Sequence, residues 1–320
     1  MNEQNGNGTP VNQVSPEILK KRKRRDRIIL IVFFSVAALI VSAVVAFHLY
    51  MNPPGHIYVY RGGGYAWNAE FAQYTQLVVK PGVKTIPDRL FSCCDHAESV
   101  RIPDSVRTIG KRAFEGCQKL TELTIPDSVT EIGDYAFEEC ENLLTIKLSD
   151  NLGAIAPGLF YACNALTGIT IPEGVSEIGN HAFNHCHEIP SVTIPDAVTR
   201  IGDYAFYYCT DLADVAFGAG LTEIGSRAFS ACPNLTNVDL PDGLSLIGNY
   251  AFRNSGLTRV SLPASLTRLG KASFAECASL TEITFRGTTE EWNALEKDAS
   301  WMNGSPIATV VCTNGTITIE

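Results

Sequence analysis

The sequence predicts a mainly β repeat solenoid, a stack of nine units of 22–23 residues with a parallel sheet on one face, preceded by one transmembrane α-helix. Phenylalanine recurs nine times at intervals of 23 residues, or 22 at the last step, and cysteine follows three residues later in eight of these units. A fixed period of this length is the signature of a repeat architecture. Before the repeats, residues 28–47 form a run of twenty uncharged residues. As a helix, such a run spans about 30 Å, the thickness of a bilayer core.

Residues 1–27 predict a disordered, basic cytoplasmic tail. The first 19 residues are rich in Asn, Gly, Gln and Pro and have no apolar periodicity, so they cannot offset the entropy lost on ordering. Seven of the 25 basic residues of the chain, but only three of the 34 acidic ones, lie in residues 1–50. The remainder is therefore acidic and lacks the clustered positive charge that a phosphate backbone requires. We expect no nucleic-acid partner.

Residues 28–50 predict a transmembrane helix that begins its apolar run at Ile28 and ends it at Phe47. The basic cluster lies directly before this run, so the positive-inside rule places the N-terminus in the cytoplasm and the repeats outside the cell. A cleaved signal peptide is the alternative, with small residues near Ala46 as the cleavage site. The apolar run exceeds the roughly 7–15 residues of a signal-peptide core, which favours an uncleaved, single-pass membrane anchor.

Residues 51–76 predict a linker followed by an N-terminal cap. Pro53 and Pro54 are typical of a linker, and residues 56–76 combine aromatic side chains with a glycine run. This combination favours a hairpin-like cap at the start of the repeats.

Residues 287–320 predict a C-terminal cap. Thr288 and Glu291 have the spacing of a capping box, so a short helix is expected to begin near Thr289, with Trp292 as its apolar anchor. A solenoid needs such an end to stay soluble, because its last unit has no neighbour to cover it.

Each unit within residues 77–286 has a strand, a turn and a return segment. Leu123 and Ile125 alternate with polar Glu122 and Thr124, the period-two pattern of a half-buried strand. Proline follows in six units and marks the end of strand pairing, because it has no N–H to donate. Glycine follows the next apolar residue in seven units, as a positive φ or a close backbone approach requires. One such unit cannot bury its apolar side alone, but a stack can.

The unit in residues 120–140 reads Leu-x-x-Leu-x-Ile-Pro-x-x-Val-x-x-Ile-Gly-x-x-Ala-Phe-x-x-Cys. This pattern resembles the BspA-type leucine-rich repeats, which share the strand, the Ile-Gly turn and the Ala-Phe-x-x-Cys return. The resemblance implies a leucine-rich-repeat-like stack and a surface protein, mostly of bacterial origin, used in adhesion and protein binding. The pattern departs from the common leucine-rich consensus, in which Asn or Cys lies two residues past the strand leucine pair.

The cysteine ladder predicts buried thiols rather than disulfides. Its eight members are expected to point inward side by side, and parallel side chains keep their Cβ atoms farther apart than the ~3.8 Å usual in a disulfide. They are Cys94, Cys117, Cys140, Cys163, Cys186, Cys209, Cys232 and Cys277.

His181, His185, Cys186 and His187 form the densest set of residue types that bind metals. Cys186 belongs to the inward ladder, and no second Cys or carboxylate set has a ligand spacing, so we expect surface histidines and no metal site. The sequence also contains no Gly-x-Ser-x-Gly elbow, His-Glu-x-x-His motif or phosphate loop. We therefore expect neither catalysis nor a cofactor.

The outward strand positions are a candidate binding face. They are small and polar and lack the aromatic platforms that sugar sites recruit, so they favour a protein ligand, although plain solvated sheet is an alternative. The candidate residues on this face are Glu122, Thr145, Lys147, Ser191, Asp214, Asn237, Asp239 and Arg259.

A tyrosine-bearing edge is the second candidate. Tyr135, Tyr204 and Tyr250 share one position of the repeat, and Tyr207 and Tyr208 lie near the same edge. Exposed tyrosine is enriched at interfaces, so Tyr204, Tyr207 and Tyr208 are candidate binding residues. Tyrosines that only cover the core of the solenoid are the alternative.

These features predict a membrane-anchored surface protein that binds a protein ligand or mediates adhesion. An alternative is an envelope signalling or regulatory subunit whose N-terminal tail contacts a cytoplasmic partner. The tail has only 27 residues, which favours the first interpretation.

Overall fold

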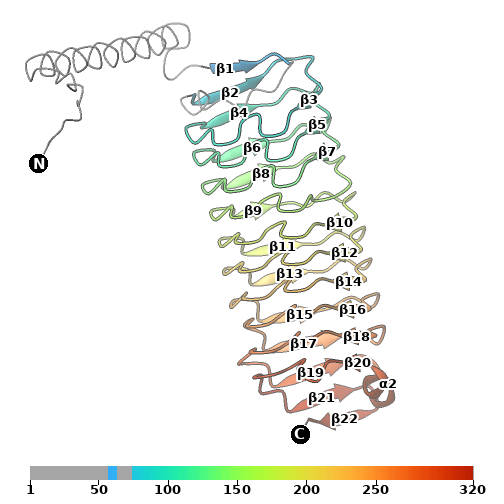
Figure 1. Ribbon diagram of the computed structural model, residues 1–320. Coiled ribbons are helices and arrows are strands. Elements are labelled where there is room, and N and C mark those ends of the chain that lie inside the picture. Colours follow the sequence, from blue (N-terminus) through green and yellow to red (C-terminus); the bar gives the residue numbers. More distant parts are fainter. Residues whose placement is uncertain (1–56, 63–73, 320) are drawn as a thin grey trace, which may run out of the picture. The chain divides into compact units, whose positions relative to one another are not determined.

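The computed structural model describes residues 57–62 and 74–319, which form a mainly β solenoid of about 11 turns (Figure 1). The tail and the membrane helix predicted for residues 1–50 lie outside the described residues. Within the described part, no helix is both long and apolar enough to cross a membrane. The nine predicted repeats are continued by further turns at both ends of the stack.

One main strand per turn builds the first side of the solenoid. Most of them pair in parallel with the equivalent strand of the next turn, as in the register Glu122 with Thr145 and Leu123 with Ile146. The main strands are β1 (Ile57–Tyr60), β2 (Gln76–Val79), β4 (Ser99–Arg101), β6 (Glu122–Thr124), β8 (Thr145–Lys147), β9 (Gly168–Ile169), β11 (Ser191–Thr193), β13 (Asp214–Ala216), β15 (Asn237–Asp239), β17 (Arg259–Leu262), β19 (Glu282–Phe285) and β21 (Thr309–Cys312).

A second column of two-residue strands builds the next side, beside the first in Figure 1. These short strands also pair in parallel from turn to turn, as Ile201 does with Ile224. They are β3 (Thr85–Ile86), β5 (Thr108–Ile109), β7 (Glu131–Ile132), β10 (Glu177–Ile178), β12 (Arg200–Ile201), β14 (Glu223–Ile224), β16 (Leu246–Ile247), β18 (Arg268–Leu269) and β20 (Glu296–Lys297).

The proline and the glycine of the repeat act at the two ends of this path. Strand β6 ends at Thr124, two residues before Pro126, so the proline marks the end of pairing as predicted. The glycine that follows seven of the nine short strands allows a close approach and does not adopt a positive φ. A Cβ on Gly202 would lie 2.6 Å from the backbone nitrogen of Asn180 in the preceding turn. Any larger residue there would push neighbouring turns apart.

Each turn closes through a return edge, which we define as the segment from the turn glycine to the ladder cysteine, such as residues 202–209. The residues two before and two after the ladder phenylalanine have a left-handed backbone, as at Tyr204 (φ 56°) and Tyr208 (φ 60°). This conformation costs a non-glycine residue roughly 1–2 kcal/mol. In return, the N–H groups of Tyr204, Phe206 and Tyr208 donate to carbonyls of the next turn at 2.8, 2.8 and 3.0 Å.

The core is a ladder of phenylalanine rings. All nine ladder phenylalanines, from Phe91 to Phe274, are fully buried, as predicted. Phe183 stacks on Phe160 with ring centroids 5.4 Å apart and on Phe206 at 5.0 Å. Because every turn adds one ring to the same stack, each turn completes the core of its neighbours.

The cysteine ladder lies beside these rings. All eight members are buried, and all ten cysteines of the chain are free thiols. Each thiol from the second member onward donates to the carbonyl of a phenylalanine in the preceding turn, as Cys186 Sγ does to Phe160 O at 3.1 Å. Ser255 stands at the ladder position without cysteine, and its buried hydroxyl donates to Phe252 O at 2.7 Å. The position therefore selects a small side chain that can donate a hydrogen bond.

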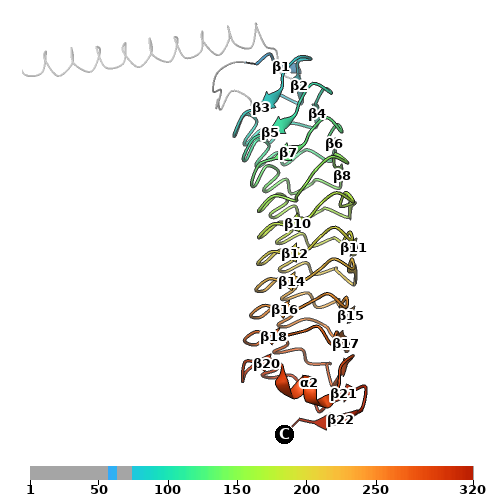
Figure 2. The same cartoon turned by 90° about the vertical axis from the view of Figure 1, so that its right-hand side faces the viewer.

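The C-terminal end is capped as the sequence predicts. Helix α2 (Thr289–Ala294) begins after a complete capping box, in which Glu291 N donates to Thr288 Oγ1 and Thr288 N donates to Glu291 Oε2. Trp292 is buried, and Trp301 lies edge-on to the last ladder ring, Phe274. Strand β22 (Gly315–Thr318) then pairs antiparallel with β21, below α2 in Figure 2.

At the N-terminal end, the hairpin-like form of the predicted cap is wrong. Strand β1 pairs with β2 in parallel, with Ile57 opposite Gln76 and Tyr60 opposite Val79. A hairpin would require antiparallel pairing. The first strand is thus one more turn of the solenoid, and its Tyr60 ring packs edge-on against Phe91.

Candidate binding surfaces

The outward side chains of the main strands form a strand face. In β6, β8, β11, β13 and β15 the middle residue is buried and both flanking residues are exposed, which is the predicted alternation. All eight candidate residues of this face are exposed: Glu122, Thr145, Lys147, Ser191, Asp214, Asn237, Asp239 and Arg259.

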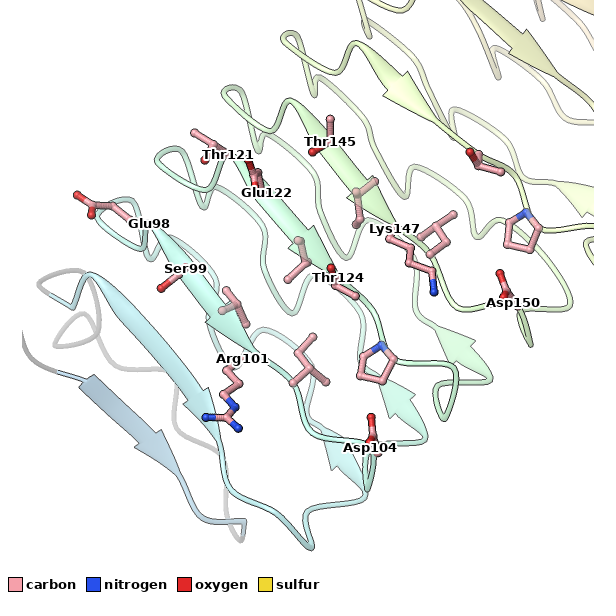
Figure 3. A pocket seen from close by; sticks show the side chains of 18 residues that line it. Glu98, Ser99, Arg101, Asp104, Thr121, Glu122, Thr124, Thr145, Lys147 and Asp150 are labelled. Atoms are coloured by element: carbon pink, nitrogen blue, oxygen red, sulfur yellow. The ribbon is translucent and has the colours of Figure 1, made fainter.

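The first turns of the strand face enclose a shallow hollow of about 900 Å³. Figure 3 shows its labelled side chains on three neighbouring strands, β4, β6 and β8, and on the segments directly before and after them. Glu122, Thr145 and Lys147 come together here with Arg101 and Glu98. Charges of both signs line this hollow.

A second hollow, of about 780 Å³, lies on the strand face between β13 and β19. It collects Asp214, Asn237, Asp239 and Arg259. Ser191 lines neither hollow. The structure therefore divides the candidates of the strand face into two groups along the stack.

Ion pairs distinguish the acidic residues of the strand face from one another. Arg286 Nη1 lies 2.8 Å from Asp239 Oδ1. Lys147 Nζ lies 3.9 Å from Asp127 Oδ1. Within the described part of the chain, Glu122 and Asp214 take part in no ion pair. Their carboxylates remain available to a partner.

The return edge brings Tyr204, Tyr207 and Tyr208 together. The rings of Tyr204 and Tyr207 lie 5.5 Å apart at 71°, and those of Tyr207 and Tyr208 lie 6.0 Å apart. Their surroundings form an open groove of about 560 Å³, which we call the tyrosine–histidine groove. The residues that line it include Tyr161, His181, Asn184, His185, Tyr204, Tyr207, Tyr208 and Arg227.

Two histidines belong to this groove rather than to a fully exposed surface. His181 stacks on Tyr204 at 4.8 Å and 10°, and the His185 ring lies 5.1 Å from that of Tyr208. Burial lowers the pKa of both imidazoles below the ordinary value. Neighbouring His187 lowers the pKa of His185 further, whereas Asp203 opposes the effect at His181.

Sequence reasoning missed two members of the groove, Asn184 and Arg227. Positions 181, 204 and 227 form one column because they differ by the 23-residue period, so the repeat register contained the signal for Arg227. Tyr250 shares this column but lies outside the groove, against the far side of Arg227 at 4.6 Å. Tyr135 also lies outside it, where its ring covers Gly158.

The residue set that suggested a metal site is not arranged to form one. Cys186 is buried in the ladder and donates to a backbone carbonyl, so it faces away from the histidines. Among residues 57–62 and 74–319, no group of three or more His, Cys, Asp or Glu is placed to hold a metal ion.

The stacked turns, most of which have a main strand, an Ile-Gly turn and a Phe–Cys return, define a leucine-rich repeat solenoid. A family model described as BspA type leucine rich repeat region, in six copies, matches residues 84–213 and 199–299, more than half of the chain. The chain therefore belongs to the BspA-type leucine-rich repeat family.

Among solved structures, the chain is similar to a leucine rich cell surface protein from Faecalibacterium prausnitzii, with 32% identity and a TM-score of 0.50. The match covers 71% of this chain and 64% of that protein's length. A leucine rich repeat protein from T. pallidum is 30% identical over 56% of this chain and 86% of its own length, with a TM-score of 0.49. The comparison with curated proteins gave no match.

Proposed function

We propose that this chain is a membrane-anchored protein of the cell surface whose strand face binds a protein ligand, in adhesion or in recognition of a neighbouring surface. The strand face carries this proposal, because its outward side chains are exposed on successive turns and no described element covers them. The similar Faecalibacterium prausnitzii protein, described as a cell surface protein, supports display outside the cell. The solenoid fold is typically non-catalytic, and we assign no reaction to it.

The dimensions of the strand face suit a protein partner. Nine main strands, β4 to β19, spaced by about 4.8 Å, extend over roughly 40 Å. A standard interface buries about 800 Å² per partner, which such a face accommodates. The two hollows offer contact points for basic side chains, because Glu122 in one and Asp214 in the other form no ion pair with any described residue.

A photo-crosslinking experiment tests the strand face in the full-length chain on intact cells. A photoreactive amino acid replaces Ser191 on the strand face or, as a matched control, exposed Thr130 beside short strand β7. We expect a discrete protein adduct from position 191 that disappears in the Glu122→Arg, Asp214→Arg double variant. Glu131→Arg on β7 should leave it unchanged. An adduct from position 130 alone, or one that survives the double variant, would contradict the proposal.

The membrane anchor has a separate test. Its basis is the uncharged run at residues 28–47 with basic residues on one side only. Protease added to intact cells should digest the repeats and spare an N-terminal tag. Release of the repeats into the medium would instead favour a cleaved signal peptide, and digestion of the tag would favour the reverse orientation.

A further inference from the structure

The tyrosine–histidine groove contains an arginine, Arg227, that has no acidic partner among the described residues. The Arg227 guanidinium lies 5.3 Å from the ring centroid of Tyr204 and 4.6 Å from that of Tyr250, and it donates a hydrogen bond to Tyr204 Oη. Arg253 on the same edge pairs with Glu276 at 2.7 Å. No carboxylate of the described residues pairs with Arg227. In a chain of net charge −9, this positive charge is left open to an anionic group from outside.

A buried amide orients the two imidazoles of the groove. Asn184 is 4% exposed, with its Nδ2 2.8 Å from His181 Nδ1 and its Oδ1 2.5 Å from His185 Nδ1. An amide nitrogen donates and an amide oxygen accepts, so one imidazole accepts through Nδ1 and the other donates. Asn184 thus occupies the Nδ1 atoms of both rings. Neither Nε2 has a hydrogen-bond partner within the described part of the chain, and both remain for a ligand.

The groove therefore presents N–H donors and positive charge. His181, which accepts at Nδ1, carries its proton on Nε2, and His185 gains an Nε2 proton when it becomes charged. The charged and titratable groups that face the two rings are His187, Asp203, Tyr161, Tyr204, Tyr207, Tyr208, Arg227 and the Arg253–Glu276 pair. Asp203 already accepts from Ser226 N at 2.7 Å, and Glu276 is neutralised by Arg253.

The packing of the rings favours a peptide over a sugar. A sugar platform needs an open aromatic face. The two faces of Tyr204 are covered by His181 from the preceding turn and Arg227 from the following turn. His185 lies edge-on to Tyr207 at 61°. The groove therefore exposes ring edges, hydroxyls and N–H groups.

We propose that the tyrosine–histidine groove is a second binding site, separate from the strand face, that takes a carboxylate-bearing peptide segment of a protein partner. Arg227 and the Nε2 atoms of His181 and His185 donate to the carboxylates, and Tyr208, which is 43% exposed, packs against the aliphatic part of the segment. Both imidazoles are mainly neutral at pH 7 because burial lowers their pKa. A bound anion favours their charged forms, so affinity rises as the pH falls below about 6.5.

Fluorescence anisotropy with a labelled hexaglutamate peptide tests this site in the full-length chain, held in nanodiscs of neutral lipid. Residues 20–25 are replaced by Gln in every arm, so that the basic tail does not capture the probe. Hexaglutamine and hexagalacturonate serve as comparison ligands. We expect hexaglutamate to bind about tenfold more tightly near pH 5.5 than near pH 7.5, since a bound carboxylate favours the charged form of both imidazoles and the lower pH supplies the protons. Glu122→Arg with Asp214→Arg on the strand face should leave this affinity within about twofold.

Variants separate the groove from general surface charge. Arg227→Gln should weaken hexaglutamate binding at least about fivefold near pH 5.5, because it removes a charge-assisted donor. Arg107→Gln removes an equal, exposed charge elsewhere and should not. His181→Gln with His185→Gln should abolish the pH dependence, and Tyr208→Ala, which spares the donors, should weaken binding at both pH values. Equal losses in Arg107→Gln and Arg227→Gln, tighter binding of hexagalacturonate than of hexaglutamate, or pH dependence that survives the histidine variants would each overturn the proposal.

Discussion

The strand face and the return edge are made by the same turns, yet they use their side chains differently. On the strand face, Thr145 and Ser191 are exposed at the ends of alternating strands, and within the described part of the chain their hydroxyls make no hydrogen bond to another turn. On the return edge, side chains of successive turns interlock, as His181, Tyr204 and Arg227 do in one column. A repeat can therefore provide one surface that tolerates substitutions and another on which the side chains of successive turns depend on one another.

The two sides also differ in what lies beneath them. The phenylalanine and cysteine ladders lie behind the return edge, and smaller aliphatic residues such as Val192 lie behind the strand face. The return edge additionally contains the left-handed residues and the close glycine contacts. Substitutions there should affect the stability of the stack, whereas those on the strand face should mainly affect binding.

The largest expected effect is a loss of stability at alkaline pH, caused by the buried cysteines that lie behind the return edge. Burial raises the pKa of Cys94 and of Cys232 to about 12 and that of Cys186 and Cys209 in the same direction. In the unfolded chain a thiol ionises near pH 8.5, so stability is full below about pH 8.5 and falls as the pH rises toward 12. Each such thiol subtracts about 1.4 kcal/mol per pH unit in that window.

Denaturant titrations from pH 7 to 11, followed by circular dichroism, measure this loss. Cys186→Ala with Cys209→Ala should make the decline shallower by about 1.4 kcal/mol per pH unit for each thiol removed, after allowance for a lower starting stability. Cys93→Ala, which removes an exposed thiol, is the control. A pH profile identical in the double variant and the parent would show that the ladder thiols do not control alkaline stability.

The next effect is a cavity in the phenylalanine ladder. Phe183→Ala removes a fully buried ring stacked on both neighbours and should lower the free energy of unfolding by about 3–5 kcal/mol. Glu122→Ala on the strand face should change it by no more than about 0.5 kcal/mol. Urea denaturation measures the free energy of unfolding of both variants. Equal decreases in the two variants would mean that the return edge and the strand face contribute equally to the core.

Much of the fold follows from the repeat itself. A unit with one apolar side must stack, so the 23-residue period alone places Phe183 and Cys186 in the core and Glu122 on the surface. The capping box at Thr288 could be predicted from the sequence because its two hydrogen bonds join residues only three positions apart. The parallel direction of β1 could not be predicted, since it depends on pairing with β2 across a segment whose composition resembles a turn.

Less of the candidate site could be predicted, because it depends on contacts between turns. Tyr204, Tyr208 and His185 occupy backbone positions with positive φ, where glycine would be the usual residue, so the sequence does not indicate this conformation. Nothing in the sequence distinguishes Asn184, next to the ladder phenylalanine, from other polar residues, and only the fold shows that its amide joins two imidazoles. The strand face was simpler to predict, since a period of two decides which side each residue occupies.

A matched pair of glycines compares the two sides at the backbone. Gly202→Ala places a Cβ 2.6 Å from a backbone nitrogen and should destabilise the protein by about 1–3 kcal/mol, as overpacking does. Gly168→Ala on the strand face meets nothing within 4 Å and should stabilise it by about 0.4–1 kcal/mol through the lower entropy of the unfolded chain. Thermal unfolding of the two variants should therefore shift in opposite directions, and equal shifts would remove this difference between the sides.

The smallest effect concerns coupling between turns. A double-mutant cycle of Arg227→Ala and Tyr250→Ala should give a coupling energy of about 0.5–1 kcal/mol, because the guanidinium lies 4.6 Å from the ring centroid and is partly shielded from water. The pair Lys147 and Asp127 on the opposite side is separated by 3.9 Å and solvent-exposed, so its cycle should give less than about 0.3 kcal/mol. Raising the salt concentration to about 0.5 M should abolish the second value before the first, since mobile ions screen exposed charges most effectively. Equal coupling in the two cycles would mean that the return edge is no more interlocked than the strand face, and the groove would lose the rigidity that orients its donors.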